Sequence, residues 1–325
     1  MKTTRKQNLL VVVLAGVLTL VSTAEAEQGG SGHYVSGATA SFIDTAPDKP
    51  GIAALNIFLD YNDATANPSR GLPFGGNIAL NVTANVYADS AVLFYTFKPQ
   101  PWLLGGYYTV GAAVPYMWSN IKAGGTIDLL GHQVNKTVSQ NANGVGDIEF
   151  WPFMLGWTNG DFKYDTRLAI YAPSGEYNKG DLANVGLGYW TFEPEVTFSW
   201  LSSKIGTEVS VFAGMDFNTE NTDANYQSGD IFHADATVAQ HFPLFGGFGG
   251  VGANAFYYKQ VTADSGSGAR LGSFEAMSEG IGPVASYAHD FGKKQLVVEA
   301  KWLPQTQVDN TVKGSFIWVK VALLF

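Results

Sequence analysis

Apolar and polar residues alternate with a period of two along most of this chain. Between Ile205 and Phe217 the odd positions are mostly apolar, whereas the even positions include Glu208, Ser210 and Asp216. Successive side chains of a β-strand point to opposite faces of a sheet, so this pattern predicts strands with one apolar and one polar face. After residue 26 the sequence has no convincing 3.6-residue period, which would indicate amphipathic helices.

Twelve segments carry the alternation, some clearly and some weakly. They are 55–61, 78–94, 103–115, 147–157, 162–172, 190–200, 205–217, 231–242, 250–258, 280–287, 296–302 and 316–325. Short and long connections follow one another, as in bacterial outer-membrane barrels with short periplasmic turns and long extracellular loops. The long loops are expected at 62–77, 119–146, 173–188 and 218–229.

The composition restricts the class of protein further. Charged residues make up 14% of the chain, against roughly 25% in soluble domains. Beyond residue 21 no apolar run approaches the ~20 residues that a transmembrane helix needs, and the chain has no cysteine for disulfides or thiolate metal sites. An open sheet would leave unpaired backbone groups in lipid. We therefore predict an all-β fold, a single transmembrane antiparallel β-barrel of about twelve strands.

The first 26 residues have the form of a signal peptide. A basic start at Lys2, Arg5 and Lys6 precedes an apolar core over residues 9–21, and residues 24–26 fit a small-residue cleavage site. An uncleaved anchor is disfavoured because the apolar core is short. We expect cleavage after residue 26 and export to the bacterial outer membrane.

The mature chain divides into an N-terminal segment and the barrel. Residues 27–51 are glycine-rich and show little periodicity, whereas residues 52–325 carry the alternation. We interpret 27–51 as a possible plug that folds into the lumen and presents His33 and Tyr34 there. The alternative is a disordered periplasmic tail.

The polar strand faces would line the lumen if the apolar faces meet lipid. In strand 78–94 this assigns Asn85, Tyr87 and Asp89 to the lumen, and Val86 and Val92 to lipid. In strand 55–61 it likewise assigns Phe58 and Asp60 to the lumen. A barrel of twelve strands lies between the roughly eight that side chains can fill and the sixteen or more that enclose a channel, so the lumen should be narrow.

Acids outnumber bases on the predicted lumenal face, and aromatic residues share it. The substrate-path candidates are Arg167, Glu193, Glu195, His233, Asp235, Trp151, Tyr171, Phe212, Tyr258 and Trp318. Aromatic rings beside carboxylates favour a path for small, partly apolar molecules. The alternative is that acid–base pairs only neutralise a packed interior.

The carboxyl terminus carries its own signal. Apolar residues occupy alternate positions up to Phe325. This arrangement looks like the C-terminal signal that outer-membrane proteins present to the barrel-assembly machinery, although an ordinary edge strand could also end in phenylalanine.

The sequence gives little support to an enzyme. His233 and Asp235 share a face, but no serine is placed beside them, and a lumenal hydrogen-bonded pair is the favoured interpretation. There is no G-x-S-x-G elbow, P-loop or H-E-x-x-H motif. We expect no catalytic residues, no cofactor and no metal site. The loop acids near Glu220 and Asp264 could bridge cations to lipopolysaccharide, but a solvated acidic loop is the simpler interpretation.

Several stretches resemble the outer-membrane family described as a putative meta-pathway of phenol degradation. They are Gly32–Gly37, Tyr171–Tyr177, Tyr189–Pro194, Asn218–Asn221, Ser228–His233 and Asp264–Gly272. Ser36 stands where proline is expected, and Gly188 where asparagine is expected. The resemblance implies a transporter-like channel, often encoded near genes for the degradation of aromatic compounds.

Together these features predict a channel for passive uptake of small, aromatic or partly hydrophobic molecules. A general or sugar- or nucleoside-selective porin is one alternative, and a structural or adhesive barrel acting through its loops is another. The expected partners are the small-molecule substrate, outer-membrane lipid and lipopolysaccharide, and the barrel-assembly machinery. Nucleic acid is not expected, because the net charge is −9.

Overall fold

The computed structural model describes residues 29–67, 71–74, 77–129, 132–269, 271–272 and 274–325. The predicted signal peptide, residues 1–26, lies outside these residues. Among the described helical residues, no helix has the length and apolar character needed to cross a membrane.

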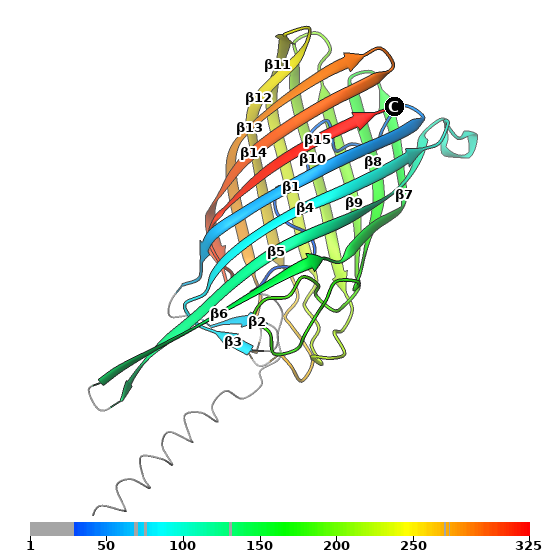
Figure 1. Cartoon of the computed structure of the whole chain (residues 1–325). Helices are drawn as coiled ribbons and strands as arrows, with labels where there is room; N and C mark the ends of the chain where they lie inside the picture. The colour runs from blue at the N-terminus through cyan, green and yellow to red at the C-terminus, as the bar shows by residue number, and fades with distance from the viewer. Residues whose placement is uncertain (1–28, 68–70, 75–76, 130–131, 270, 273) are drawn as a thin grey trace, which may run out of the picture.

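Twelve antiparallel strands close into a barrel (Figure 1). They are β1 (Gly51–Thr65), β4 (Thr83–Thr96), β5 (Tyr107–Leu129), β7 (Ile148–Asn159), β8 (Phe162–Ala172), β9 (Thr191–Leu201), β10 (Thr207–Asn218), β11 (Ile231–Leu244), β12 (Gly247–Gln260), β13 (Met277–Phe291), β14 (Lys294–Asp309) and β15 (Ser315–Leu324). The first and last strands close the ring, from the Ala53–Leu324 pair to the Asp60–Ile317 pair. The predicted all-β, twelve-stranded barrel is confirmed.

The two-residue turns lie at one end of the barrel, and the longest connections lie at the other. Residues 160–161, 245–246 and 292–293 form short turns at the end that carries the carboxyl terminus. The connections 173–190, 219–230 and 261–276 form long loops at the other end. We call these the turn end and the loop end; they correspond to the predicted periplasmic and extracellular ends.

The prediction of a loop at 119–146 was wrong. β5 continues past the barrel and pairs with β6 (His132–Val145), so that the two form a long hairpin that projects from the loop end (Figure 1). The base of this hairpin packs on buried apolar residues through Ile121, Ala123 and Ala142. Farther out, the side chains of residues 136–139 are exposed, and the sequence there lacks the apolar alternation of the barrel strands. A smaller hairpin, β2 (Leu72–Phe74) with β3 (Asn77–Ala79), lies nearby.

The predicted faces of β1 and β4 were also wrong. Asp60, Asp89 and Tyr87 do not point into the lumen, and Asn56 donates a hydrogen bond to Asp89 on the exposed outer side. The inner faces of these two strands carry aliphatic residues instead. Period two shows that a strand has two faces, but it does not show which face is inside when the interior is itself apolar.

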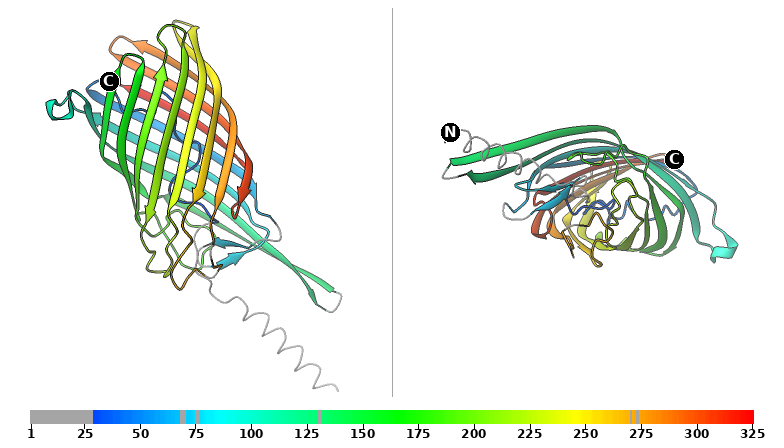
Figure 2. Two further views of the ribbon diagram at one scale, coloured as in Figure 1. Left: turned by 180° about the vertical axis from the view of Figure 1, so that it is seen from behind. Right: turned by 90° about the horizontal axis from the view of Figure 1, so that it is seen from below.

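The described part of the N-terminal segment, residues 29–50, lies inside the barrel. Figure 2 shows it in blue within the ring of strands. The backbone N–H of Gly29 donates to the carbonyl of Pro73 at the loop end, and the segment enters β1 at Gly51, where the backbone N–H of Phe325 donates to the carbonyl of Ile52. The segment therefore runs through the lumen from the loop end to the turn end.

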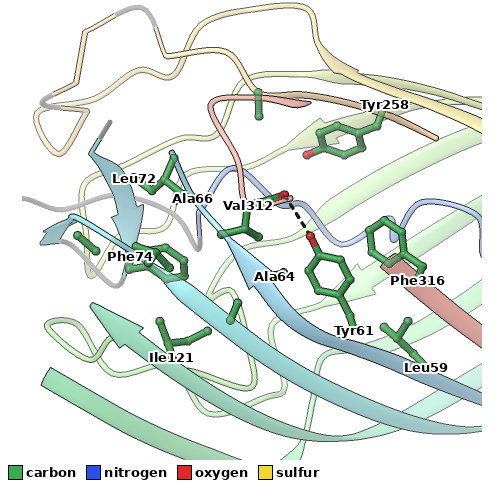
Figure 3. Close-up of a cluster of buried hydrophobic side chains, with 14 of the residues drawn as sticks. Leu59, Tyr61, Ala64, Ala66, Leu72, Phe74, Ile121, Tyr258, Val312 and Phe316 are labelled. Atoms are coloured by element: carbon green, nitrogen blue, oxygen red, sulfur yellow. Dashed lines mark hydrogen bonds between the residues drawn. The ribbon is translucent and has the colours of Figure 1, made fainter. Parts of the chain in front are cut away.

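A buried apolar cluster lies in the lumen near the loop end (Figure 3). The rings of Tyr61 and Phe316 stack with centroids 4.3 Å apart, and the Tyr61 hydroxyl donates to the carbonyl of Val312 at 3.1 Å. Leu72 and Phe74 of the small hairpin pack against the same cluster. The cluster narrows the lumen where the long loops meet.

Candidate functional site

A cavity of about 840 Å³ runs beside the N-terminal segment inside the barrel. Phe74 and Val312 line it near the loop end, and Lys294 and Phe325 line it near the turn end. The cavity therefore extends along most of the lumen. Its volume suits a small organic molecule.

One wall of this cavity is aliphatic. It is formed by the inner faces of β1, β4 and β5 and consists mainly of Leu55, Ile57, Leu59, Val86, Ala88, Val92, Met117 and Ile121. This wall was not predicted, because the alternation in the sequence assigned the valines of β4 to lipid. The run Leu55, Ile57, Leu59 on alternate positions of β1 is the signal from which it could have been found.

The rest of the cavity lining includes polar and aromatic residues of the other strands and of the N-terminal segment. The predicted path residues that line the cavity are Trp151, Arg167, Tyr171, Glu193, Glu195, Tyr258 and Trp318, and the predicted plug residues His33 and Tyr34 line it as well. An apolar molecule in the cavity would therefore contact aliphatic side chains of β1, β4 and β5 as well as aromatic and hydrogen-bonding groups.

Three predicted path residues, Phe212, His233 and Asp235, lie behind the N-terminal segment rather than on the cavity. The Tyr34 ring stacks on His233 with centroids 3.6 Å apart, and its hydroxyl donates to Asp235. The Arg167 guanidinium lies 5.4 Å from the centre of the Phe212 ring. These side chains contact the segment or the wall, so they are not placed to meet a passing molecule.

Carboxylates of the barrel wall accept hydrogen bonds from backbone N–H groups of the segment. The pairs are Gly37 with Asp235 (3.2 Å), Phe42 with Glu208 (2.7 Å) and Ala46 with Asp165 (2.9 Å). Each of these acids is buried. The segment does not pair with a strand, so its backbone N–H groups lack the usual carbonyl acceptors of a sheet. The buried acids of the wall accept hydrogen bonds from these N–H groups instead.

Donors of the wall satisfy carbonyl groups of the same segment. The pairs are Ser36 with Trp318 Nε1 (3.1 Å), Thr39 with Lys301 Nζ (2.5 Å) and Asp44 with Arg167 Nη2 (2.9 Å). Irregular backbone at membrane depth is tolerated only where protein or water satisfies its polar groups. The sequence placed these wall residues on the inner face but gave no indication that their partner is the backbone of residues 36–46.

His33 links the segment to the long loop between β8 and β9. Its Nε2 lies 2.9 Å from Asp147 Oδ2, and its Nδ1 lies 2.7 Å from Thr191 Oγ1. Asp147 also accepts the backbone N–H groups of Gly175 and Leu187 in that loop. The start of the segment and this loop are therefore held by one carboxylate.

A second carboxylate, Asp264, joins the two remaining long loops. It accepts hydrogen bonds from the Tyr226 hydroxyl, the Gly229 N–H and the Gln260 amide. Burial raises the pKa of Asp264 above its usual value, although these three donors offset part of the increase. Asp264 is thus not the solvated loop acid that the sequence suggested.

Among the described residues, three buried donors converge with the spacing of a metal site. They are Glu193 on β9, Asp216 on β10 and His233 on β11, and their ligand atoms lie within 4.8 Å of one another. The sequence placed all three on the inner face but did not group them.

Comparisons with known proteins agree with this architecture. The model of the family described as "Putative MetA-pathway of phenol degradation" matches residues 69–321. An outer-membrane channel from Pseudomonas putida F1 is similar in structure, with a TM-score of 0.61 and 12% identity over 88% of this chain and 100% of that chain. The β domain of the Bordetella autotransporter BrkA has a TM-score of 0.46 and 9% identity, over 85% of this chain and 100% of that chain. No curated protein matches the sequence.

Proposed function

The chain belongs to the family described as "Putative MetA-pathway of phenol degradation", and on that premise we propose that it is a channel for passive uptake of small aromatic or otherwise partly hydrophobic molecules. Its β-barrel has the fold of an outer-membrane channel. We further propose that residues 1–26 direct its export to the outer membrane and that its long loops contact lipopolysaccharide.

The aliphatic wall of the lumenal cavity carries this proposal. A general porin lines its channel with polar groups. Here one side of the cavity is built from Leu, Ile, Val and Met side chains of β1, β4 and β5, and these strands direct polar groups such as Asp89 outward. Transfer of an apolar molecule onto such a wall removes apolar area from water, which is favourable by roughly 25 cal/mol per Å².

The N-terminal segment would act as the selective constriction. It divides the lumen lengthwise and leaves the cavity of about 840 Å³ at its side. Small molecules would pass between the segment and the aliphatic wall, whereas larger hydrophilic solutes would be held back.

The test replaces two valines of the cavity wall by their polar isostere. Val86→Thr with Val92→Thr keeps the shape of the wall but adds hydroxyl groups to it. A strain that lacks its chromosomal copy and carries this double variant is expected to grow more slowly on limiting toluene or phenol than the same strain carrying the unchanged protein. Conductance of inorganic ions through the purified channel should change little.

The matched control is Val196→Thr with Val211→Thr, two valines on the outer face of β9 and β10 that are 61% and 42% exposed. This variant should support growth as the unchanged protein does. Equal growth of the deletion strain and the complemented strain on these substrates would refute the proposal. Large ohmic conductance steps with no preference for apolar solutes would favour a general porin instead.

A further inference from the structure

Glu193, Asp216 and His233 form a buried cluster in which hydrogen bonds satisfy the polar atoms only in part. Both carboxylate oxygens of Asp216 are buried, and neither they nor His233 Nε2 take part in a hydrogen bond of normal geometry. The side chain of Asp216 is fully buried, with 0% exposure. A buried carboxylate is costly unless a cation or donors compensate its charge, and an unsatisfied buried group in a folded protein calls for an explanation.

The cluster has the residue types and the approximate spacing of a three-ligand metal centre. His233 Nε2 lies 3.0 Å from Glu193 Oε1 and 3.5 Å from Asp216 Oδ1. In a tetrahedral Zn²⁺ site with bonds of about 2.0–2.2 Å, neighbouring ligand atoms are about 3.3–3.6 Å apart. One imidazole and two carboxylates are a ligand set that Zn²⁺ accepts, whereas Ca²⁺ prefers six to eight oxygen ligands.

Two neighbouring residues leave room for the His233 imidazole and fix the Glu193 carboxylate. Gly214 lies opposite His233 across the β10–β11 pair, and a Cβ there would lie 2.5 Å from His233 Nε2, so only glycine leaves room for the imidazole. The Tyr171 hydroxyl donates to the second oxygen of Glu193 at 2.8 Å. Hydrogen bonds of this kind orient metal ligands in known sites.

The N-terminal segment covers the cluster. Tyr34 stacks on His233, and a Cβ at Gly32 would lie 3.6 Å from Asp216 Oδ2. An ion held by the three side chains would therefore be enclosed between the barrel wall and the segment. We propose that Glu193, Asp216 and His233 bind one Zn²⁺-like divalent transition-metal ion, and that this ion helps to hold the segment against β9–β11.

The first experiment measures bound metal. The mature protein is refolded in detergent with ZnCl₂, desalted, and analysed for zinc per chain. The unchanged protein is expected to retain one Zn²⁺, and Asp216→Asn and His233→Gln to retain at least about tenfold less at the same free Zn²⁺ concentration. Co²⁺ in place of Zn²⁺ should give the visible absorption of a tetrahedral centre in the unchanged protein, but not in Asp216→Asn or His233→Gln.

His241→Gln is the matched control. His241 forms a buried pair with Glu208 at 2.7 Å, so this variant also removes a lumenal imidazole beside a carboxylate, but outside the cluster. It should retain zinc as the unchanged protein does. Heat-modifiable migration on gels establishes that each variant is folded. If Asp216→Asn does not fold, Gly214→Ala serves instead, because its Cβ displaces the imidazole and is expected to weaken zinc retention.

The second experiment tests the coupling to the segment. Since the chain has no cysteine, Ser36→Cys gives a single thiol at a buried position of the segment. Zn²⁺ should slow maleimide labelling of this thiol, and should not do so when Asp216→Asn is added. The proposal is overturned if the unchanged protein retains no more zinc than Asp216→Asn, or if His241→Gln loses as much. Zinc retention without slower labelling would overturn the coupling to the segment.

Discussion

At Gly37 the N-terminal segment turns with φ of +78°, and an added Cβ would overlap the Leu303 side chain. Gly37→Ala therefore combines a left-handed backbone, which costs about 1–3 kcal/mol for a residue with a Cβ, with a steric overlap. We expect it to displace the segment and to increase the maleimide labelling rate of Ser36→Cys by more than tenfold. Gly292→Ala is the control, because Gly292 has φ of +65° with nothing within 4 Å of its Cβ position. Equal labelling in both variants would show that packing at Gly37 is unimportant.

Tyr34 holds the segment by its hydroxyl as well as by its ring. Tyr34→Phe keeps the stacking on His233 but removes a donor from Asp235, which then retains the Gly37 N–H and the Thr39 hydroxyl. Loss of a hydrogen bond to a charged group costs about 1.5–3 kcal/mol. Labelling of Ser36→Cys should therefore become roughly ten- to a hundredfold faster. Tyr287→Phe, which removes a hydroxyl bonded at the turn end to the carbonyl of Phe245, should leave the rate unchanged.

At the scale of elements, the sequence predicted the strands well and some of their faces poorly. All twelve barrel strands were located. The inner and outer faces of most strands have different environments, so apolar and polar residues alternate along the sequence. In β8 to β12 the inner face is polar, so residues such as Glu193 were placed correctly. In β1 and β4 the inner face is aliphatic and the outer face carries Asp89. The assignment of polar faces to the lumen therefore predicted the wrong inner face for these two strands.

The candidate site was predicted only in part for a related reason. Period two assigns a side chain to a face, but it says nothing about the irregular segment that occupies the lumen. His233 and Asp235 were therefore placed inside, yet their contact with Tyr34 depends on how residues 29–50 cross the barrel. Contacts between a strand and an aperiodic segment have no signature in a single sequence.

The N-terminal segment as an element limits the open area of the lumen. Deletion of residues 29–50 leaves the predicted signal peptide and β1 intact, and it removes the chain that crosses the barrel beside the cavity. The single-channel conductance of the deletion variant is expected to rise severalfold in planar bilayers. Removal of residues 127–134 from the tip of the β5–β6 hairpin is the control and should not change conductance, because that tip projects beyond the barrel. Unchanged conductance after deletion of 29–50 would exclude a role for the segment as a constriction.

On the scale of the whole molecule, the excess of acids in the lumen has a structural explanation. Asp165, Glu208 and Asp235 accept backbone N–H groups of the segment, and Asp147 and Asp264 accept those of the long loops. The barrel wall thus supplies acceptors for the segment and for the loop between β8 and β9, and Asp264 supplies one between the two other long loops. These acids do not occupy the aliphatic wall of β1, β4 and β5, which is the proposed path for transport.

A substitution at Phe325 can distinguish two roles of the carboxyl terminus, one in the stability of the barrel and one in its assembly in cells. The backbone N–H of Phe325 donates to the carbonyl of Ile52 at 2.9 Å, which any residue can do, and its ring is 48% exposed beside Lys294. Phe325→Ser should therefore alter refolding into detergent very little. If the ring is read by the barrel-assembly machinery, the same variant should greatly reduce the amount of heat-modifiable protein in outer membranes. Phe291→Ser, at a 55% exposed phenylalanine of the same end, should leave both measurements unchanged. A loss of refolding in detergent equal to the loss in cells would instead assign Phe325 a purely structural role.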